Sequence, residues 1–187
     1  MGRRLLTMSC TRTVLVILLM NDDQGQKSCE DSDWVKINQH TVCFKGKGNH
    51  YGSFYNYVRE GLITAIKLEY VSGTIRCLKE VQYDSRWGCN GYSLVKDYPF
   101  NVIVTDDNDN VLFPKKKYVK YPAALYYWMP FINPVDADEL VFMDYRTPFY
   151  FPLEKELRIW YGEDLKNWSE VDNVGRVCVN VYAQFKL

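Results

Sequence analysis

The feature that most constrains this chain is its closing stretch, GRVCVNVYAQFKL, which begins at Gly175 and alternates between two kinds of side chain. A period of two is the pattern of a β-strand with one buried face. The face predicted to be buried carries Val177, Val179, Val181 and Ala183, and the opposite face carries Cys178, Asn180, Tyr182 and Gln184. A strand of this kind needs partner strands beside it and a second layer over its apolar face.

Similar short runs recur along the chain and predict about ten strands, with the 8–12-residue spacing of turn signals that is typical of sandwiches and barrels. They include a run that ends in a Ser-Gly turn at Gly73, a hairpin across residues 100–114 and an aromatic strand that begins at Ala123. Helix signals are few, and the 16% aromatic content favours strands. The sequence therefore predicts an all-β fold, an antiparallel β-sandwich with jelly-roll-like character that disulfides stabilise.

The N-terminal segment has the pattern of a secretory signal. The basic start MGRR is followed by the apolar run VLVILLM, from Val14 to Met20. This run is too short to cross a bilayer, which needs roughly 20 apolar residues. We expect a signal peptide over residues 1–25, an N-terminal arm over 26–34 and one sandwich domain over 35–187, in a secreted, extracellular protein without stable membrane insertion. The alternative is an uncleaved buried strand of a cytosolic domain.

The cysteines agree with export, because paired cysteines are typical of secreted domains. Cys77 and Cys89 flank a short loop and are expected to pair, and Cys43 is expected to pair with Cys178 in the last strand. Cys10 falls in the predicted signal. Cys29 would then have no partner within the chain, and it would link two chains or pair elsewhere.

Charge narrows the classes of partner. The 23 basic and 23 acidic residues give a formal net charge of zero, which argues against a dedicated nucleic-acid binder. One basic cluster contains Lys115, Lys116, Lys117 and Lys120. It fits a solvated edge strand guarded by lysines, and the alternative is a patch for a heparin-like polymer or an anionic lipid.

The segment between the last two predicted strands is rich in oxygen ligands. Its candidate calcium ligands are Glu163, Asp164, Glu170, Asp172 and Asn173. The competing interpretation is a solvated acidic turn in which Asp172 and Asn173 bond their own backbone. The same segment holds an N-glycosylation motif at Asn167. A second oxygen-rich stretch, TDDNDN from Thr105, lacks the glycine and glutamate of an EF-hand and is interpreted as a hairpin turn.

Three aromatic residues are candidates for stacking on a ligand, namely Tyr126, Trp128 and Trp168. Packing in the core or at an edge is the alternative for each of them. Catalysis has little support, because no nucleophile elbow occurs and two carboxylates, such as Glu163 with Glu139 or Glu170, define a glycosidase only by their geometry. We therefore expect a protein that is not an enzyme.

The C-terminal sequence resembles a group of uncharacterised secreted β-sandwich domains of cnidarians and other marine invertebrates. The resemblance covers residues 35–187 and is carried by a W-Y-G-E-D element, a D-N-x-G-x-x-C element and a V-Y-A element. The matching residues are Trp160, Tyr161, Gly162, Glu163, Asp164, Asp172, Asn173, Gly175, Cys178, Val181, Tyr182 and Ala183. The resemblance implies an extracellular animal module and transfers no catalytic residue.

These observations predict a secreted binding, adhesion or matrix module whose partner is an extracellular protein or a glycan, with calcium as the candidate cofactor. The first alternative is a lectin-like carbohydrate-binding protein, and the second is a secreted glycoside hydrolase.

Overall fold

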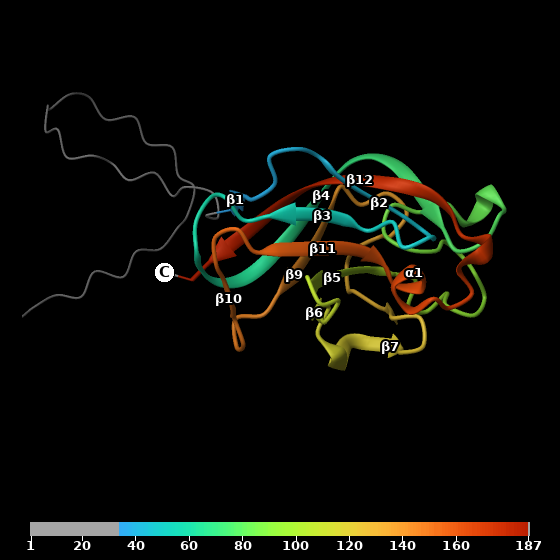
Figure 1. Ribbon diagram of the computed structural model, residues 1–187. Helices are drawn as coiled ribbons and strands as arrows, with labels where there is room; N and C mark the ends of the chain where they lie inside the picture. The colour runs from blue at the N-terminus through green and yellow to red at the C-terminus, as the bar shows by residue number, and fades with distance from the viewer. Residues whose placement is uncertain (1–33, 187) are drawn as a thin grey trace, which may run out of the picture. The chain divides into compact units, whose positions relative to one another are not determined.

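Two antiparallel sheets and a short hairpin make up the fold of residues 34–186, which are the residues that the computed structural model describes (Figure 1). The predicted signal peptide, Cys10, Cys29 and all of the predicted arm except Trp34 lie outside these residues. The all-β sandwich expected from the sequence is confirmed. Within residues 34–186 no helix is long and apolar enough to span a membrane.

The larger sheet is built on two long strands, β4 and β12, which pair antiparallel from Val174 opposite Arg76 to Phe185 opposite Ile63. Shorter strands flank this pair, with β1 and β2 beside β12, and β9 and β10 beside β4. The strands of this sheet are β1 (Trp34–Lys36), β2 (Val42–Lys45), β4 (Gly61–Arg76), β9 (Glu139–Met143), β10 (Phe149–Phe151) and β12 (Val174–Phe185).

The smaller sheet has the strand order β3-β11-β5-β6 and lies against the first. Its strands are β3 (Gly52–Tyr55), β5 (Val102–Asp106), β6 (Val111–Phe113) and β11 (Glu156–Tyr161). A separate hairpin pairs β7 (Val119–Tyr121) with β8 (Tyr126–Tyr127). The helical turns are η1 (Val81–Tyr83), η2 (Lys116–Tyr118), α1 (Gly162–Lys166) and η3 (Glu170–Asp172).

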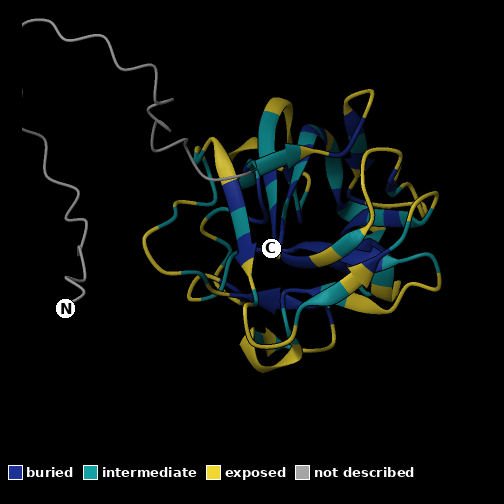
Figure 2. Cartoon of the chain, turned by 90° about the vertical axis from the view of Figure 1, so that its left-hand side faces the viewer, coloured by how far each residue is buried: buried dark blue, intermediate teal, exposed yellow. Residues whose placement is uncertain are grey.

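The core lies between the two sheets. Val177, Val179, Val181 and Ala183 of β12 are buried, as their alternation predicts, and Ile159 and Trp160 of β11 are buried in the smaller sheet. Figure 2 shows buried positions along the strands and exposed positions mostly in the connecting loops. On the other face of β12, Asn180 and Tyr182 both donate hydrogen bonds to Glu69 of β4, so this half-buried face is held by polar contacts.

The Ser-Gly turn expected at Gly73 is wrong, because β4 continues through this position to Arg76. The ladder instead contains a bulge, in which Ser72 pairs with Cys178 and Tyr70 with Val179 while Val71 is skipped. Gly73 has a φ of +92°, and a Cβ atom there would lie 2.0 Å from the carbonyl oxygen of Arg176. Glycine is therefore needed for a close approach of two strands rather than for a reversal of the chain.

The aromatic strand expected from Ala123 is also much shorter than predicted. Only Tyr126 and Tyr127 are in a strand, and Leu125 just before them has a φ of +61° that extended structure does not allow. The hairpin expected across residues 100–114 is confirmed as β5 and β6. In its turn, the Asp106 carboxylate accepts hydrogen bonds from the backbone of Asn108 and Asn110, each at 2.9 Å.

Two disulfides join the cysteine pairs expected from the sequence. Cys43 of β2 lies directly opposite Cys178 of β12 and is bonded to it, and Cys77 is bonded to Cys89. The first bridge ties residues 135 positions apart, and the second closes a separation of 12 positions. The first bridge also sets β2 beside the start of β12, which brings the loop after β2 close to the segment before β12.

Candidate functional site

One end of the sandwich brings together two segments that are far apart in sequence. The loop between β2 and β3, residues 46–51, meets the segment that follows β11, where α1 lies (Figure 1). Gly162 starts this helix against a neighbouring loop, and a Cβ atom on it would lie 2.7 Å from the carbonyl oxygen of Ala124. Its backbone nitrogen donates a hydrogen bond of 2.7 Å to the carbonyl oxygen of Asn101, which fixes where the helix begins.

Asp164 holds the 46–51 loop in place. Its side chain is fully buried, and its two carboxylate oxygens accept hydrogen bonds from the backbone nitrogens of Asn49, at 2.8 Å, and His50, at 3.1 Å. Glu170 adds a third bond from the backbone nitrogen of Gly48, at 3.1 Å. Hydrogen bonds from backbone N–H groups to a carboxylate are strong, because one partner is charged. This acidic segment therefore acts as a clamp on a neighbouring loop. The competing interpretation of a solvated acidic turn is wrong for Glu163 and Asp164, because both are buried.

Glu163 points the other way, into the core. Its residue is 2% exposed, and its Oε1 accepts a hydrogen bond of 3.0 Å from the hydroxyl of Tyr126. That hydroxyl lies 3.5 Å from the hydroxyl of Tyr161, which donates to the carbonyl oxygen of Gly88. The Oε2 atom of Glu163 is buried without a hydrogen-bond partner.

Asn173 contributes a second buried acceptor without a partner. Its Nδ2 donates a hydrogen bond of 2.7 Å to the carbonyl oxygen of Gly46, and its Oδ1 has no donor. The side chain of Asn173 acts on the pKa of Glu163, which places the two groups close together. Leaving a buried acceptor unsatisfied costs about 1–3 kcal/mol. Two such atoms in one place favour a bound proton or a cation between them.

The carboxyl groups of Glu163 and Asp164 keep their protons to a higher pH than ordinary carboxyl groups do. Burial raises the pKa of Glu163 to about 7, and the nearby side chains of Asn173 and Tyr126 keep this pKa from rising further. Burial and a hydrogen bond shared with Glu170 together raise the pKa of Asp164 to about 6. Part of this cluster is therefore protonated near neutral pH.

An open surface cavity of about 520 Å³ lies beside the clamp. It is lined by Lys45, Lys47, Gly48, His50, Glu170 and Val171. The cavity presents an imidazole, two ammonium groups and a carboxylate, so it can exchange several hydrogen bonds with a polyhydroxylated ligand. Lys47 also donates a hydrogen bond of 2.8 Å to the carbonyl oxygen of Val171, which ties the two walls together.

The five candidate calcium ligands lie in this region but do not converge on one point. Both oxygens of Asp164 are taken by backbone N–H groups. Among residues 34–186, no three His, Cys, Asp or Glu side chains form a group that could hold a metal ion. Among the buried oxygens of these five residues, Glu163 Oε2 and Asn173 Oδ1 have no hydrogen-bond partner. Asp172 lies half-buried in η3.

The three aromatic candidates have different environments. Tyr126 is fully buried and cannot stack on a surface ligand, because its ring packs in the core and its hydroxyl contacts Glu163. Trp168 is half-buried edge-on against Tyr121, with 5.3 Å between the ring centroids. Trp128 is 51% exposed and lines a different pocket.

The remaining predicted residues are separated from one another. Asn167 is exposed at the end of α1, where a glycan could be attached. Glu139 lies in β9 and forms an ion pair with Lys67, so it does not form a carboxylate pair with Glu163. His50, Lys47 and Gly48 were not predicted, although the pairing of Cys43 with Cys178 already indicated that the loop after Cys43 lies near the start of the last strand.

An extracellular-type, disulfide-linked β-sandwich with a polar site at one end is the class that the fold and this site define. Comparison with known proteins narrows this class to a family. No protein-family model and no curated protein matches the chain. Among solved structures it is similar to AJLec, a lectin from the sea anemone Anthopleura japonica, with 36% sequence identity and a TM-score of 0.75. The match covers 83% of this chain and 98% of AJLec.

At this identity and coverage, the chain belongs to the family of AJLec. The expected kinship with cnidarian β-sandwich domains is therefore supported, and membership of a lectin family is consistent with a binding protein rather than an enzyme.

Proposed function

We propose that this protein is a secreted lectin, which binds a carbohydrate reversibly and does not change it chemically. The observation that carries the proposal is its 36% identity to AJLec over 98% of that lectin. The two disulfides support an extracellular setting, because such bonds persist in oxidising compartments. The similarity to AJLec favours carbohydrate binding, the first alternative that the sequence offers, over an adhesion or matrix role.

The cavity beside the clamp is the site we assign to the carbohydrate. Lectin sites bind hydroxyl groups through several fixed polar groups, and here His50, Lys47 and Glu170 line one open cavity. Asp164 and Glu170 fix the backbone of the 46–51 loop, so the loop is held before a ligand arrives. A preorganised site loses less conformational entropy on binding.

A glycan array tests the function and its site together. The wild-type protein should retain a defined set of glycans, and His50→Ala should weaken this retention at least tenfold. His40→Ala is the matched control, because His40 is the other of the two histidines in the chain and is exposed outside this cavity. Absence of glycan retention, combined with binding to an extracellular protein, would contradict the lectin proposal and favour the adhesion alternative.

Calcium is the cofactor we propose for the same end of the molecule. Glu163 and Asn173 would hold it, since each has a buried oxygen without a partner and calcium takes oxygen ligands. Calcium requires 6–8 oxygens, so main-chain carbonyls or water would have to supply the others. Bound calcium would neutralise the buried carboxylates and stiffen the two segments.

Thermal melting tests the calcium proposal independently of any glycan. Excess calcium should raise the melting temperature above that in EDTA, because a ligand that binds only the folded state stabilises it. The rise should be larger at pH 8 than at pH 6, because protons compete for Glu163. Glu163→Gln should abolish it. A melt that is the same in EDTA and calcium would remove calcium from the account and leave a proton as the partner of these oxygens.

A further inference from the structure

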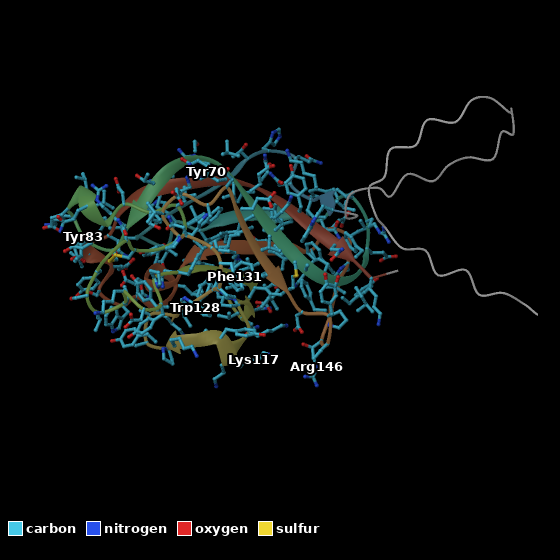
Figure 3. All side chains as sticks on the ribbon, turned by 180° about the vertical axis from the view of Figure 1, so that it is seen from behind. Tyr70, Tyr83, Lys117, Trp128, Phe131 and Arg146 are labelled. Atoms are coloured by element: carbon cyan, nitrogen blue, oxygen red, sulfur yellow. A yellow bond between two sulfur atoms is a disulfide. The ribbon has the colours of Figure 1, made fainter. Side chains whose placement is uncertain are left out.

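A different part of the surface gathers exposed aromatic and basic side chains. In Figure 3, Trp128, Lys117 and Arg146 are labelled along the lower part of the molecule, and Phe131 is labelled just above them. With Lys116 and Met143 they make up what we call the aromatic–basic face. Its residues come from η2, from the segment after β8, and from β9 and the loop that follows it. None of them lines the cavity beside the clamp.

The apolar part of this face has no cover within residues 34–186. Phe131 is fully exposed at 106%, on a backbone with a φ of +62° that a bulky side chain adopts only with strain. Trp128 and Met143, both more than half exposed, flank a pocket of about 290 Å³. Buried Phe142 also lines this pocket, so the pocket is open to an apolar group from outside.

The basic part of the face lies beside the same pocket. Lys116 and Lys117 lie between Lys115 and Tyr118, and both of these flanking residues line the pocket. Lys115 forms an ion pair of 3.2 Å with Asp144. Arg146 follows Asp144 by two residues, so this ion pair holds the segment of Arg146 beside η2. Within the described residues, neither Lys116, Lys117 nor Arg146 forms an ion pair.

The partner must therefore be apolar opposite Phe131 and Trp128 and anionic opposite the three cations. A bilayer surface that contains anionic lipid offers both properties in adjacent layers. Exposed aromatic side chains enter the interface between headgroups and acyl chains, and lysine and arginine are attracted to the anionic headgroups. A sulfated polysaccharide would match the cations but would leave the aromatic side chains and the pocket without a partner.

We infer that the aromatic–basic face docks the protein on membranes that contain anionic lipid, with Phe131 and Trp128 in the interfacial layer and Lys116, Lys117 and Arg146 over the headgroups. This is adsorption at the surface, without any spanning segment. It is independent of the carbohydrate site, which lies on other loops. The two sites together would let the protein bind a glycan while it rests on a lipid surface.

Flotation with vesicles tests the inference. The protein should float with phosphatidylcholine vesicles that contain phosphatidylserine and not with pure phosphatidylcholine vesicles, and added salt should weaken binding. Phe131→Ser should lower the affinity about tenfold, since it removes the insertion of one large apolar side chain. Lys116→Glu with Lys117→Glu should lower it about 25-fold or more, because each lysine near such a surface contributes about fivefold.

Matched controls come from another exposed segment. Val81→Ser and Lys79→Glu change an exposed apolar and an exposed basic residue, and both variants should float like the wild type. Phe131→Ser should also keep its glycan binding, which shows that it folds. Three outcomes would overturn the inference: no flotation with anionic vesicles, equal flotation with neutral vesicles, or flotation that Phe131→Ser leaves unchanged.

Discussion

Glu163 is a buried carboxyl group with one oxygen bonded to Tyr126 and the other without a partner. Its charged form is disfavoured by burial and by the nearby carboxylates of Asp172 and Glu170. The side chain is therefore most stable in the fold when it carries a proton or contacts a cation. This gives the molecule a pH dependence that can be worked out from the position of a single residue.

In the absence of calcium, the free energy of unfolding should fall as the pH rises from about 4.5 to 8. The pKa of Glu163 is about 7 in the folded state against an ordinary value of 4.5, so between these values the folded state keeps a proton that the unfolded state has released. The free energy of unfolding should decrease by about 3 kcal/mol from pH 4.5 to 8. Asp164, whose folded pKa is about 6, acts in the same direction.

Glu163→Gln should remove the Glu163 part of this slope and be more stable than the wild type at pH 8. Urea unfolding in EDTA at a series of pH values measures how the free energy of unfolding changes with pH in each protein. Glu80→Gln, an exposed position with no change expected, is the control. A variant that retained the full slope would show that other groups titrate instead.

At the scale of elements, the 46–51 loop is held from outside by the segment after β11. Asp164→Ala removes the acceptor of two backbone N–H groups. We expect a loss of about 1–3 kcal/mol in stability and weaker glycan binding. Hydrogen exchange should become faster at the amides of Asn49 and His50, while Asp97→Ala, at an exposed aspartate, should change neither. Unchanged protection of these two amides would mean that the loop is held by other contacts.

The bulge in β4 makes a second prediction at this scale. Gly73→Ala should lower stability by about 2–4 kcal/mol, because the new Cβ atom would meet the carbonyl oxygen of Arg176 at 2.0 Å. Gly91→Ala is the control for backbone strain alone, since Gly91 also has a positive φ but a Cβ atom there would have no neighbour within 4 Å. Its cost should be about 1–2 kcal/mol. Equal melting temperatures for the two variants would contradict the close approach.

The elements show where sequence reasoning succeeds and where it fails. The alternation of Val177, Val179 and Val181 identified the buried face of β12, because the period of a strand is local information. The turn expected at Gly73 failed because the need for glycine comes from a strand that lies more than a hundred residues away. The same limit applies to Asp164, since its partners at Asn49 and His50 are defined only by the fold.

For the whole molecule, the two disulfides should contribute unequally. In the chain-entropy account, a bridge over 135 positions restricts the unfolded chain more than one over 12 positions. Replacing Cys43 and Cys178 together by serine should therefore lower stability by about 4–5 kcal/mol, and replacing Cys77 and Cys89 by about 3 kcal/mol. Denaturant midpoints show which of the two double variants loses more stability. A larger loss for the Cys77 and Cys89 variant would contradict the entropic explanation.

The candidate site belongs to this scale as well, because it exists only after β2 and β12 are paired. The sequence identified the acidic residues of one segment, and the expected Cys43–Cys178 bond indicated which loop lies near them, but the hydrogen bonds that join the two segments are defined only by the fold. Trp128 could be named from its chemistry, but the surface to which it belongs depends on where the segment after β8 lies in the fold. The proposed function therefore rests on how these two segments meet in the fold and on the similarity of the chain to the lectin AJLec.

The most direct test of the central claim is to titrate the isotopically labelled protein with a glycan selected on the array and to follow its backbone amides by NMR. A carbohydrate site beside the clamp should give reversible shifts concentrated at Gly48, Asn49, His50 and the segment from Glu163 to Asn173, with the glycan recovered intact. Shifts centred on Trp128 and Phe131, or loss of the intact glycan during the titration, would contradict it.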